Sequence, residues 1–479
     1  MKVQATFLSE ADQARVDDES LRILAEVGVR YHGQRALPLL AAHGARVDAE
    51  SGIARLPAEL VGEALAAAPP SFVLGARNPV HDLALPSDTP RYGIDGTATF
   101  AIDFETGERR YGTRRDIEQA LRVFQEVDIG LMVWAPTAAS DAPSGSRAVH
   151  EFLEMARHSS KHGQHELHTA EQVPYLQAGL RALMGGDAQI RARHEYSLIY
   201  CPVAPLTHDG PMLDAYLELG GLDLPVMIMP MPVSGSTGPA SLFANIAVAN
   251  AEALSSIVVF ELAHPGRPLI YSSAVGSMDF RSGAFLAGTA EMGLQSAALT
   301  AMGRFYRIPS GAAGCTSDAR QPGPEVAIEK LITTIPPVLA GADIIVGLGE
   351  IESDQTLVLE QILVDAEIAR ICQRLCDGIE TAGGAELFDD IVEVGPGGNY
   401  LAQQSTRRAA HGREFYTPAL FDRHAYDAWV ELGRPSMYQR AREEVARILA
   451  GPVVDPLPDD VNHEIDEILA AADRDLAGH

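Results

Sequence analysis

The segments Ser197–Val203 (SLIYCPV), Val226–Met231 (VMIMPM) and Leu269–Ala274 (LIYSSA) are short runs of β-branched, aromatic and small residues, each followed by a longer helical pattern. Five further segments have the same character: Leu131–Ala135, Gln164–His168, Ser310–Gly314, Asp343–Gly347 and Ile391–Val394. Their centres lie roughly 30 to 45 residues apart, which is the length of one βα unit. Eight such units predict an α/β fold of the (β/α)8 TIM-barrel type, in which the reacting groups lie on the loops after the strand C-termini.

The chain is longer than one barrel requires. It has 479 residues, whereas a barrel typically takes about 250. The pattern of elements predicts an N-terminal helical and β extension over residues 1–112, the barrel over 113–423 and a C-terminal helical segment over 424–479.

Composition and charge narrow the class of protein. With 46% hydrophobic and 21% charged residues the chain has ample material for a globular core. No stretch approaches the ~20 apolar residues of a membrane span, and no export signal is visible at the start. Four cysteines argue against a disulfide framework, so a reducing cytoplasm is expected. A net charge of −28 argues against nucleic acid as a partner. It would suit a cationic substrate, although an acidic surface that supports solubility is the simpler interpretation.

The order and spacing of the loop motifs carry a resemblance. The chain resembles the trimethylamine methyltransferase family, corrinoid-dependent methyltransferases built on a TIM barrel, from about Leu21 to Arg423. The matching segments are Leu21–Val29, Ser51–Pro57, Ala68–Phe72, Met229–Met231, Gly235–Pro239, Gly288–Glu291, Thr316–Arg320, Glu352-Ser353, Asp365–Glu367, Gly395–Gly398 and Asp422-Arg423.

Three departures bear on the substrate. The family tends to carry lysine where Arg320 stands, and His-Phe and His-Thr pairs where this chain has Asn399-Tyr400 and Ser405-Thr406. The archaeal trimethylamine enzymes of the family use pyrrolysine, and no such residue is in this chain. Family members without it include enzymes that demethylate quaternary amines such as glycine betaine.

The resemblance therefore implies methyl transfer from a quaternary amine to cob(I)alamin, giving methylcobalamin. A quaternary ammonium already carries its charge and leaves as a neutral amine, so binding, alignment and exclusion of water suffice. The chain lacks a cobalamin motif of the Asp-x-His-x-x-Gly type, so the corrinoid is expected on a separate partner protein, with none permanently bound and no metal site. A homo-oligomer is expected as well. The alternatives are a non-catalytic methylated-amine-binding protein and another TIM-barrel enzyme, such as an aldolase or decarboxylase.

Candidate substrate-binding residues follow from the chemistry of a betaine, while no catalytic residue is assigned. Aromatic faces hold quaternary ammonium groups, and the aromatic residues at or after predicted strand ends are Trp134, Tyr200, Tyr271 and Tyr400, with Trp134 favoured. A betaine carboxylate needs a cation or N–H donors. Arg320 fits that need, unless it pairs with Asp318 or Glu325; His208 is a weaker candidate, with a surface position favoured. The candidate acids are Glu291, Asp318 and Glu350; a negative charge at the start of its helix explains Glu291 equally well.

Several other signals do not support a site. Cys372 and Cys376 are four apart in a predicted helix and indicate core packing. Cys315 has no neighbouring histidine in the sequence. His165 and His168 are three apart on a predicted strand, so they should point to opposite faces and not to a shared metal ion.

Overall fold

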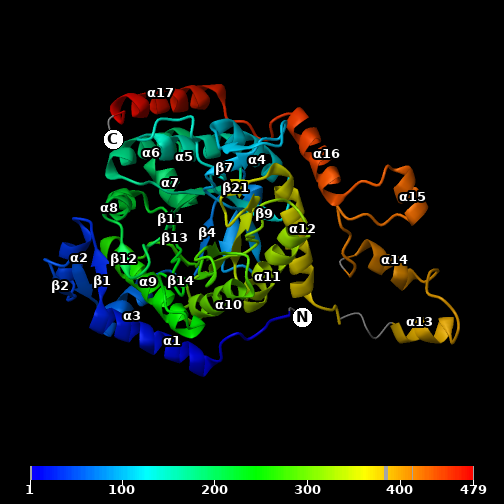
Figure 1. Cartoon of the computed structure of the whole chain (residues 1–479), viewed down its shortest axis with the longest axis horizontal. Helices are drawn as coiled ribbons and strands as arrows, with labels where there is room; N and C mark the ends of the chain where they lie inside the picture. Colours follow the sequence, from blue (N-terminus) through cyan, green and yellow to red (C-terminus); the bar gives the residue numbers. More distant parts are fainter. Residues whose placement is uncertain (1–2, 382–386, 413, 478–479) are drawn as a thin grey trace.

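The computed structural model describes residues 3–381, 387–412 and 414–477. Eight parallel strands form a ring, each paired with the next: β6 (Arg91–Ile94), β9 (Gly130–Val133), β10 (His162–His165), β11 (Tyr196–Tyr200), β13 (Val226–Ile228), β15 (Leu269–Tyr271), β18 (Gly311–Ala313) and β19 (Ile344–Leu348). β19 pairs with β6, and a parallel bridge between Tyr271 and Ser310 joins β15 to the start of β18. The predicted TIM barrel is confirmed (Figure 1).

Helices surround the barrel: α4 (Arg114–Gln125), α5 (Arg147–His158), α6 (Val173–Met184), α7 (Asp187–Arg193), α8 (Gly210–Glu218), α9 (Leu242–Ala263), α10 (Ala290–Phe305), α11 (Pro324–Ala340) and α12 (Leu359–Asp377). Local sequence signals set their ends. Thr113 and Asp116 form a capping box at the start of α4, and Gly341 ends α11 in the left-handed conformation at φ +91°.

One of the eight expected barrel strands is wrong, and one barrel strand was not predicted. The first barrel strand is β6, whose Gly93 faces the lumen where a Cβ would lie 3.1 Å from side-chain atoms of Met132 and Val346. A short strand that contains a glycine shows little alternation of apolar and polar residues, so the hydrophobic pattern of the sequence did not predict β6. Ile391–Val394, expected as the eighth strand, lies in helix α13 (Leu387–Val394) outside the barrel. The barrel strands therefore run from Arg91 to Leu348, which does not coincide with the boundaries predicted at residues 113 and 423.

The N-terminal region covers one side of the barrel and its lower end, which is the end where the barrel strands begin. α1 (Glu10–Arg22), α2 (Ala36–Ala42) and α3 (Ala58–Ala67) pack against α9. β1 (Val29–Tyr31), β2 (Arg46–Asp48), β3 (Ile53–Arg55) and β12 (Thr207–His208) form one sheet, and β4 (Phe72–Leu74) pairs with β5 (Leu83–Leu85). Leu74, Leu83 and Leu85 pack with the lower lumen residues Met132 and Ile344.

Short strands at the opposite end frame the barrel mouth. β7 (Phe100–Ile102), β8 (Arg109–Tyr111), β20 (Glu350–Ile351) and β21 (Thr356–Leu357) form one sheet. β14 (Val233–Ser234), β16 (Gly276–Met278) and β17 (Phe285–Leu286) form another. The loops that follow β6 and β19 are thus held together by hydrogen-bonded strands.

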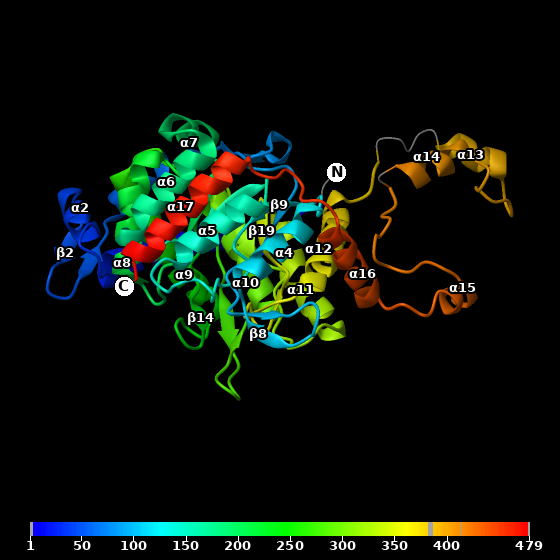
Figure 2. The ribbon, with the colours of Figure 1, turned by 90° about the horizontal axis from the view of Figure 1, so that it is seen from above.

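The C-terminal region partly leaves the body. The projecting segment, residues 387–432 without 413, contains α13, α14 (Gln404–His411) and α15 (Tyr426–Glu431) and extends to one side in two perpendicular views (Figures 1 and 2). The chain then returns through α16 (Met437–Ala450), which packs on α12 and α4, and α17 (Asp459–Asp475), which packs on α5 and α6.

Among the described residues, one helix has the length and apolarity to cross a membrane. It is α9, and 78% of its apolar window is buried inside the protein. The sequence was expected to contain no stretch with the length and apolarity of a membrane span, and α9 shows that this expectation was wrong. The apolarity of α9 is explained by its place between the barrel and the N-terminal helices.

Candidate functional site

Most of the lower barrel lumen is filled with apolar side chains, and the acidic side chains lie at the mouth. Met132, Ile199, Met227, Ile270 and Ile344 belong to one buried cluster. Strands β10 and β11 add a small polar group in which His162 and Gln164 hydrogen-bond to Ser197, whereas the residues after β6 and β19 are acidic.

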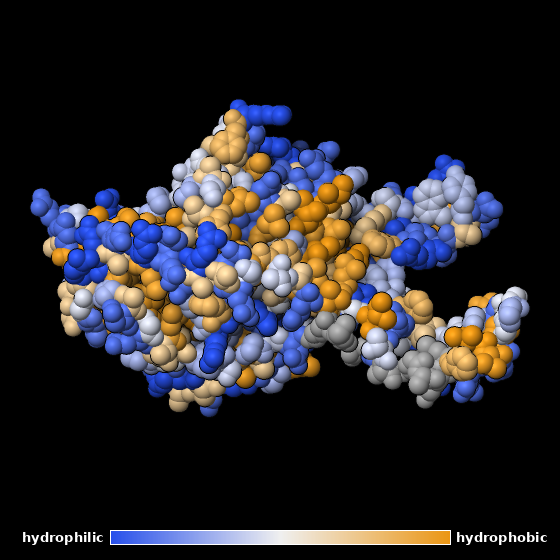
Figure 3. Space-filling model, turned by 90° about the horizontal axis from the view of Figure 1, so that it is seen from below, coloured by the Kyte–Doolittle hydropathy of each residue, from blue (hydrophilic) through white to orange (hydrophobic). Residues whose placement is uncertain are grey.

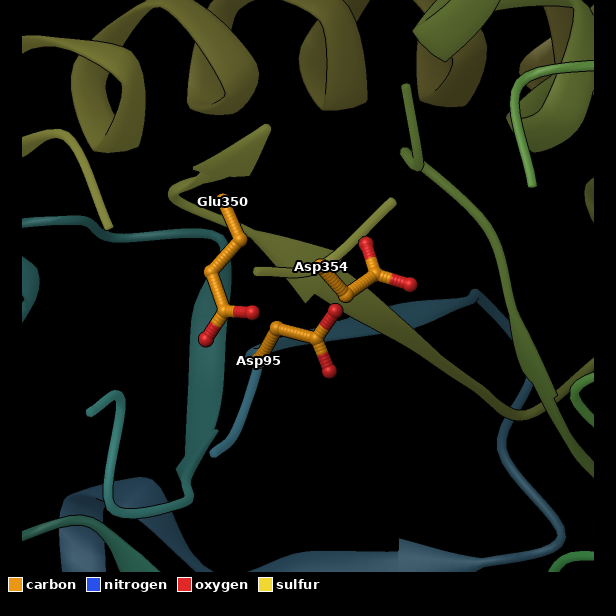
Figure 4. Close-up of side chains that lie close together, drawn as sticks. All are labelled: Asp95, Glu350 and Asp354. Atoms are coloured by element: carbon orange, nitrogen blue, oxygen red, sulfur yellow. The ribbon is translucent and has the colours of Figure 1, made fainter. Parts of the chain in front are cut away.

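Three carboxyl groups meet at the mouth (Figure 4). Asp95 follows β6, Glu350 begins β20, and Asp354 lies on the turn between β20 and β21. One carboxyl oxygen from each lies within 4.8 Å of the others. Glu350 is 0% exposed and Asp95 is 7% exposed. Within the described part of the chain, neither carboxyl oxygen of Glu350 finds a hydrogen-bond partner, and Asp354 Oδ1 has none either.

A strained turn presents Asp354. Glu352, Ser353 and Asp354 have φ of 62°, 54° and 63°, a left-handed run that costs non-glycine residues roughly 1 kcal/mol each. Neighbouring backbone holds the turn, since Glu352 N–H donates to Ala319 O at 3.0 Å and Ser353 N–H to Ser317 O at 2.7 Å. Such over-determined strain is typical of functional sites.

Burial makes these carboxyl groups resist ionisation. It raises the pKa of Asp95 to about 6, against the Gly96 N–H and the Lys330 charge, which lower it. Burial, followed by the negative charge of Asp95, holds the pKa of both Glu350 and Asp354 well above the ordinary range. A cluster of this kind lacks a counter-charge, and a bound cation would supply it.

Trp134 lies beside the carboxyl groups. It follows β9, is 4% exposed, and its Nε1–H has no hydrogen-bond partner in the described structure. Its ring packs on Gly96, where a Cβ would come within 2.7 Å of Trp134 Cγ and 2.4 Å of Ala135 O. Only glycine fits next to Asp95 while the indole holds this position. Aromatic faces combined with carboxylates are the usual surroundings of quaternary ammonium groups.

A buried ion pair stands behind the site. Lys330 of α11 donates from Nζ to Asp365 Oδ2 of α12 at 2.7 Å, to Cys315 O at 2.6 Å and to Gly347 O at 3.2 Å. Asp365 Oδ2 also accepts the Gly349 N–H at 2.8 Å. Burial alone would lower the pKa of Lys330, but the Asp365 charge raises it above its ordinary value. The pair therefore links the C-terminal ends of β18 and β19 to helices α11 and α12. Gly349, whose N–H donates to Asp365, is the residue directly before Glu350.

Tyr200, Tyr271 and His208 do not reach the lumen, so their predicted binding roles are corrected. Tyr200 donates to His208 Nδ1 at 2.7 Å, and Tyr271 donates to Asn250 Oδ1 at 2.7 Å. His208 is fully buried, not on the surface, and stacks on Tyr31 at 4.5 Å between ring centroids. All three lie in the layer between strands and helices.

Two other predicted residues also lie away from the acidic cluster. Tyr400 is 44% exposed on the projecting segment rather than at the mouth. Glu291 is exposed in the first turn of α10, where a negative charge favours the helix dipole. Neither residue belongs to the acidic cluster, and their substrate contacts stay predictions.

Arg320 and Asp318 lie at the rim. Arg320 is exposed and lines a cleft of about 330 Å³ together with Asp318, Glu352, Ser353, Gln355 and residues of β17. Asp318 accepts the Ala287 and Gly288 N–H groups at 2.7 and 2.9 Å and the Ser353 hydroxyl at 2.8 Å. Asp318 thus joins three loops. Within the described part of the chain, Arg320 forms no ion pair with Asp318 or with Glu325.

Sequence analysis missed Asp95, Asp354 and Lys330. Asp95 follows the strand that the pattern did not reveal. Lys330 lies in a helix, where a lysine ordinarily faces water. The one available signal was that the motif around Glu352-Ser353 follows a predicted strand end, which pointed to the correct loop.

Comparisons with known proteins agree with this architecture. A family model described as trimethylamine methyltransferase (MTTB) matches residues 2–477. The trimethylamine methyltransferase MttB of Methanosarcina thermophila is 30% identical over 471 residues, covering 96% of each chain. The glycine betaine methyltransferase of Desulfitobacterium hafniense (strain Y51) is 28% identical over 476 residues, covering 98% of each. The crystal structure of the Methanosarcina barkeri monomethylamine methyltransferase (MtmB) superposes with a TM-score of 0.51 at 12% identity, covering 92% of this chain and 88% of that one, which shows the shared fold.

Proposed function

Because this chain belongs to the trimethylamine methyltransferase family, we propose that it moves a methyl group from a quaternary amine such as glycine betaine to cob(I)alamin on a partner corrinoid protein. Methyltransferase activity itself is common to the family and to the named relatives. The observation that carries the quaternary substrate is the buried cluster of Asp95, Glu350 and Asp354 beside the Trp134 ring.

The protein's part in the proposed reaction is binding and alignment. The ammonium group lies against the Trp134 face, with the three carboxyl groups supplying negative charge. The carbon–nitrogen bond breaks, its electron pair leaves with the neutral tertiary amine, and the methyl carbon bonds to the acceptor. The reduced corrinoid supplies the nucleophile. Because the lower lumen is filled by side chains such as Met132 and Met227, the acceptor must approach from the mouth.

The test is direct methyl transfer. The purified protein, mixed with cob(I)alamin and glycine betaine, proline betaine, carnitine or choline, is expected to give the spectrum of methylcobalamin with at least one of them. The protein alone should be colourless. Binding of a betaine without any transfer would instead support the second candidate, a non-catalytic methylated-amine-binding protein.

Trp134→Leu is expected to weaken binding of the quaternary amine about thirtyfold, because a desolvated cation–π contact contributes roughly 2 kcal/mol. Leucine keeps most of the bulk and removes the π face. Calorimetric titration measures the change. Trp429→Leu is the matched control, since Trp429 lies on α15 of the projecting segment. Equal affinity of the Trp134 variant and the native protein would rule out the aromatic contact.

Arg320→Gln separates the two ends of a betaine. If the guanidinium at the rim holds the substrate carboxylate, the variant should bind glycine betaine about fivefold more weakly, a loss of roughly 1 kcal/mol for a solvent-exposed ion pair. Choline lacks the carboxylate and should be unaffected. Equal losses for both ligands would contradict this role for Arg320.

We also propose self-association and a cytoplasmic location. The projecting segment exposes large apolar side chains, including Phe388 at 67%, Val392 at 65% and Leu401 at 86%. Figure 3 shows apolar residues on this segment and across the adjoining face of the body. Soluble monomers rarely expose apolar patches of this kind. Because the projecting segment and the adjoining face of the body are both apolar, the segment of one copy can pack on the body of another, which favours a second copy as the partner. A monomeric mass by light scattering would contradict this. The low number of cysteines, four in 479 residues, supports a reducing compartment.

A further inference from the structure

The acidic cluster at the mouth has too little positive charge around it. Asp95, Glu350 and Asp354 face one another, and Asp318 and Asp365 add negative charge from the loop after β18 and from α12. Lys330 is the cation that faces them, and it is already ion-paired with Asp365 at 2.7 Å. Glu352, on the same turn, is paired with Arg109 of β8 at 2.9 Å.

Two features of the geometry require protons in the free site. One carboxyl oxygen from each of Asp95, Glu350 and Asp354 lies within 4.8 Å of the others, and carboxyl groups this close share protons rather than all ionising. Glu350 is 0% exposed with both oxygens unpartnered in the described structure. An ionised carboxylate without water, donor or counter-ion is strongly disfavoured in such a place.

We propose that the amine binds by proton exchange: its permanent positive charge replaces protons that Asp95, Glu350 and Asp354 hold in the free enzyme, and these protons pass to solvent. The inference rests on the proposed function for the identity of the ligand. A quaternary ammonium carries no proton, so every proton released must come from the protein.

The consequence is a pH-dependent affinity of defined sign. Protons compete with the cation, so binding strengthens as pH rises, and the slope of log Ka against pH equals the number of protons released. Release of about one proton per ligand corresponds to about a tenfold gain in affinity per pH unit. An uncharged ligand of the same shape gives no slope from this cluster.

The experiment is calorimetric titration of the full chain at pH 6, 7 and 8, in phosphate and in Tris, whose ionisation enthalpies differ. The probes are tetramethylammonium, choline and 3,3-dimethylbutan-1-ol, the carbon analogue of choline without its charge. We expect about one proton released per quaternary cation at pH 7 and none with the alcohol. Binding of the cations without proton release would overturn the inference, as would failure of both cations to bind.

Two variants and a metal titration sharpen the test. Asp354→Asn should reduce the number of protons released and flatten the pH dependence, whereas Asp141→Asn should change neither, because Asp141 pairs with Arg114 at 2.9 Å outside the cluster. Unchanged proton release in the Asp354 variant contradicts the proposal.

Release of the protons by Mg²⁺, Ca²⁺ or Zn²⁺ with exclusion of choline would also overturn the proposal in favour of a metal site. Methyl transfer without proton release would contradict this inference but agree with the proposed function. Proton release without methyl transfer would agree with this inference but contradict the proposed function.

Discussion

Glu350→Gln is expected to weaken quaternary-amine binding by roughly 150-fold, or about 3 kcal/mol, since removing one partner of a desolvated charge pair typically costs 2–5 kcal/mol. Glutamine has the shape of the protonated acid but cannot ionise when the cation enters. The loss should appear in Kd by calorimetry and in KM for methyl transfer.

The variant should fold normally. Glu350 has no hydrogen-bond partner to lose in the described structure, and its carboxyl resists ionisation, so the melting temperature should be unchanged or higher. Glu291→Gln provides the control, because Glu291 is an exposed acid on the first turn of α10. Native affinity in the Glu350 variant would exclude the acidic cluster as the cation site.

Lys330→Met should lower the free energy of unfolding by about 3–5 kcal/mol, the usual cost of leaving one member of a buried ion pair alone. Asp365 would then be a fully buried carboxylate that keeps only the N–H donors of Gly349 and Gln361. Urea unfolding measures the change. The double variant Lys330→Met with Asp365→Leu should recover most of the loss, because no uncompensated charge remains.

The second buried lysine offers a matched comparison. Lys161 donates to Phe124 O at 2.7 Å and Val127 O at 2.6 Å, and burial lowers its pKa to about 7. No carboxylate depends on it for an ion pair in the described structure, so Lys161→Met should cost only about 1–3 kcal/mol, the range for unsatisfied polar groups. Equal losses at both lysines would show that the charge of Asp365 is not the cause.

Much of the fold was predictable from the sequence because each barrel strand is a short apolar run followed by a helix. Seven of the eight expected segments coincide with strands. β6 escaped detection because Gly93 occupies the lumen position where neighbouring Met132 and Val346 leave no room. Ile391–Val394 has strand-like composition, but no neighbouring strand pairs with it and it forms part of α13.

The site was less predictable, for a reason that is general to parallel sheets. Their strands are buried on both faces and show continuous apolar runs, so the pattern does not reveal which side chains face the lumen. Tyr200 and Tyr271 were expected at the mouth, yet they face the helices and bond His208 and Asn250. Trp134 and Glu350 were expected on mouth loops, and the structure places both there.

The sequence by itself determined the barrel, the family resemblance and the loops on which chemistry depends, because these follow from local periodicity and from motifs in chain order. Only the tertiary structure decided that Asp95 meets Glu350 and Asp354, more than 250 residues further on in the sequence, and that Trp134 packs on Gly96. Closing the ring between β19 and β6 brings these strand ends together. Their burial then follows from packing, and with it the demand for a positive charge.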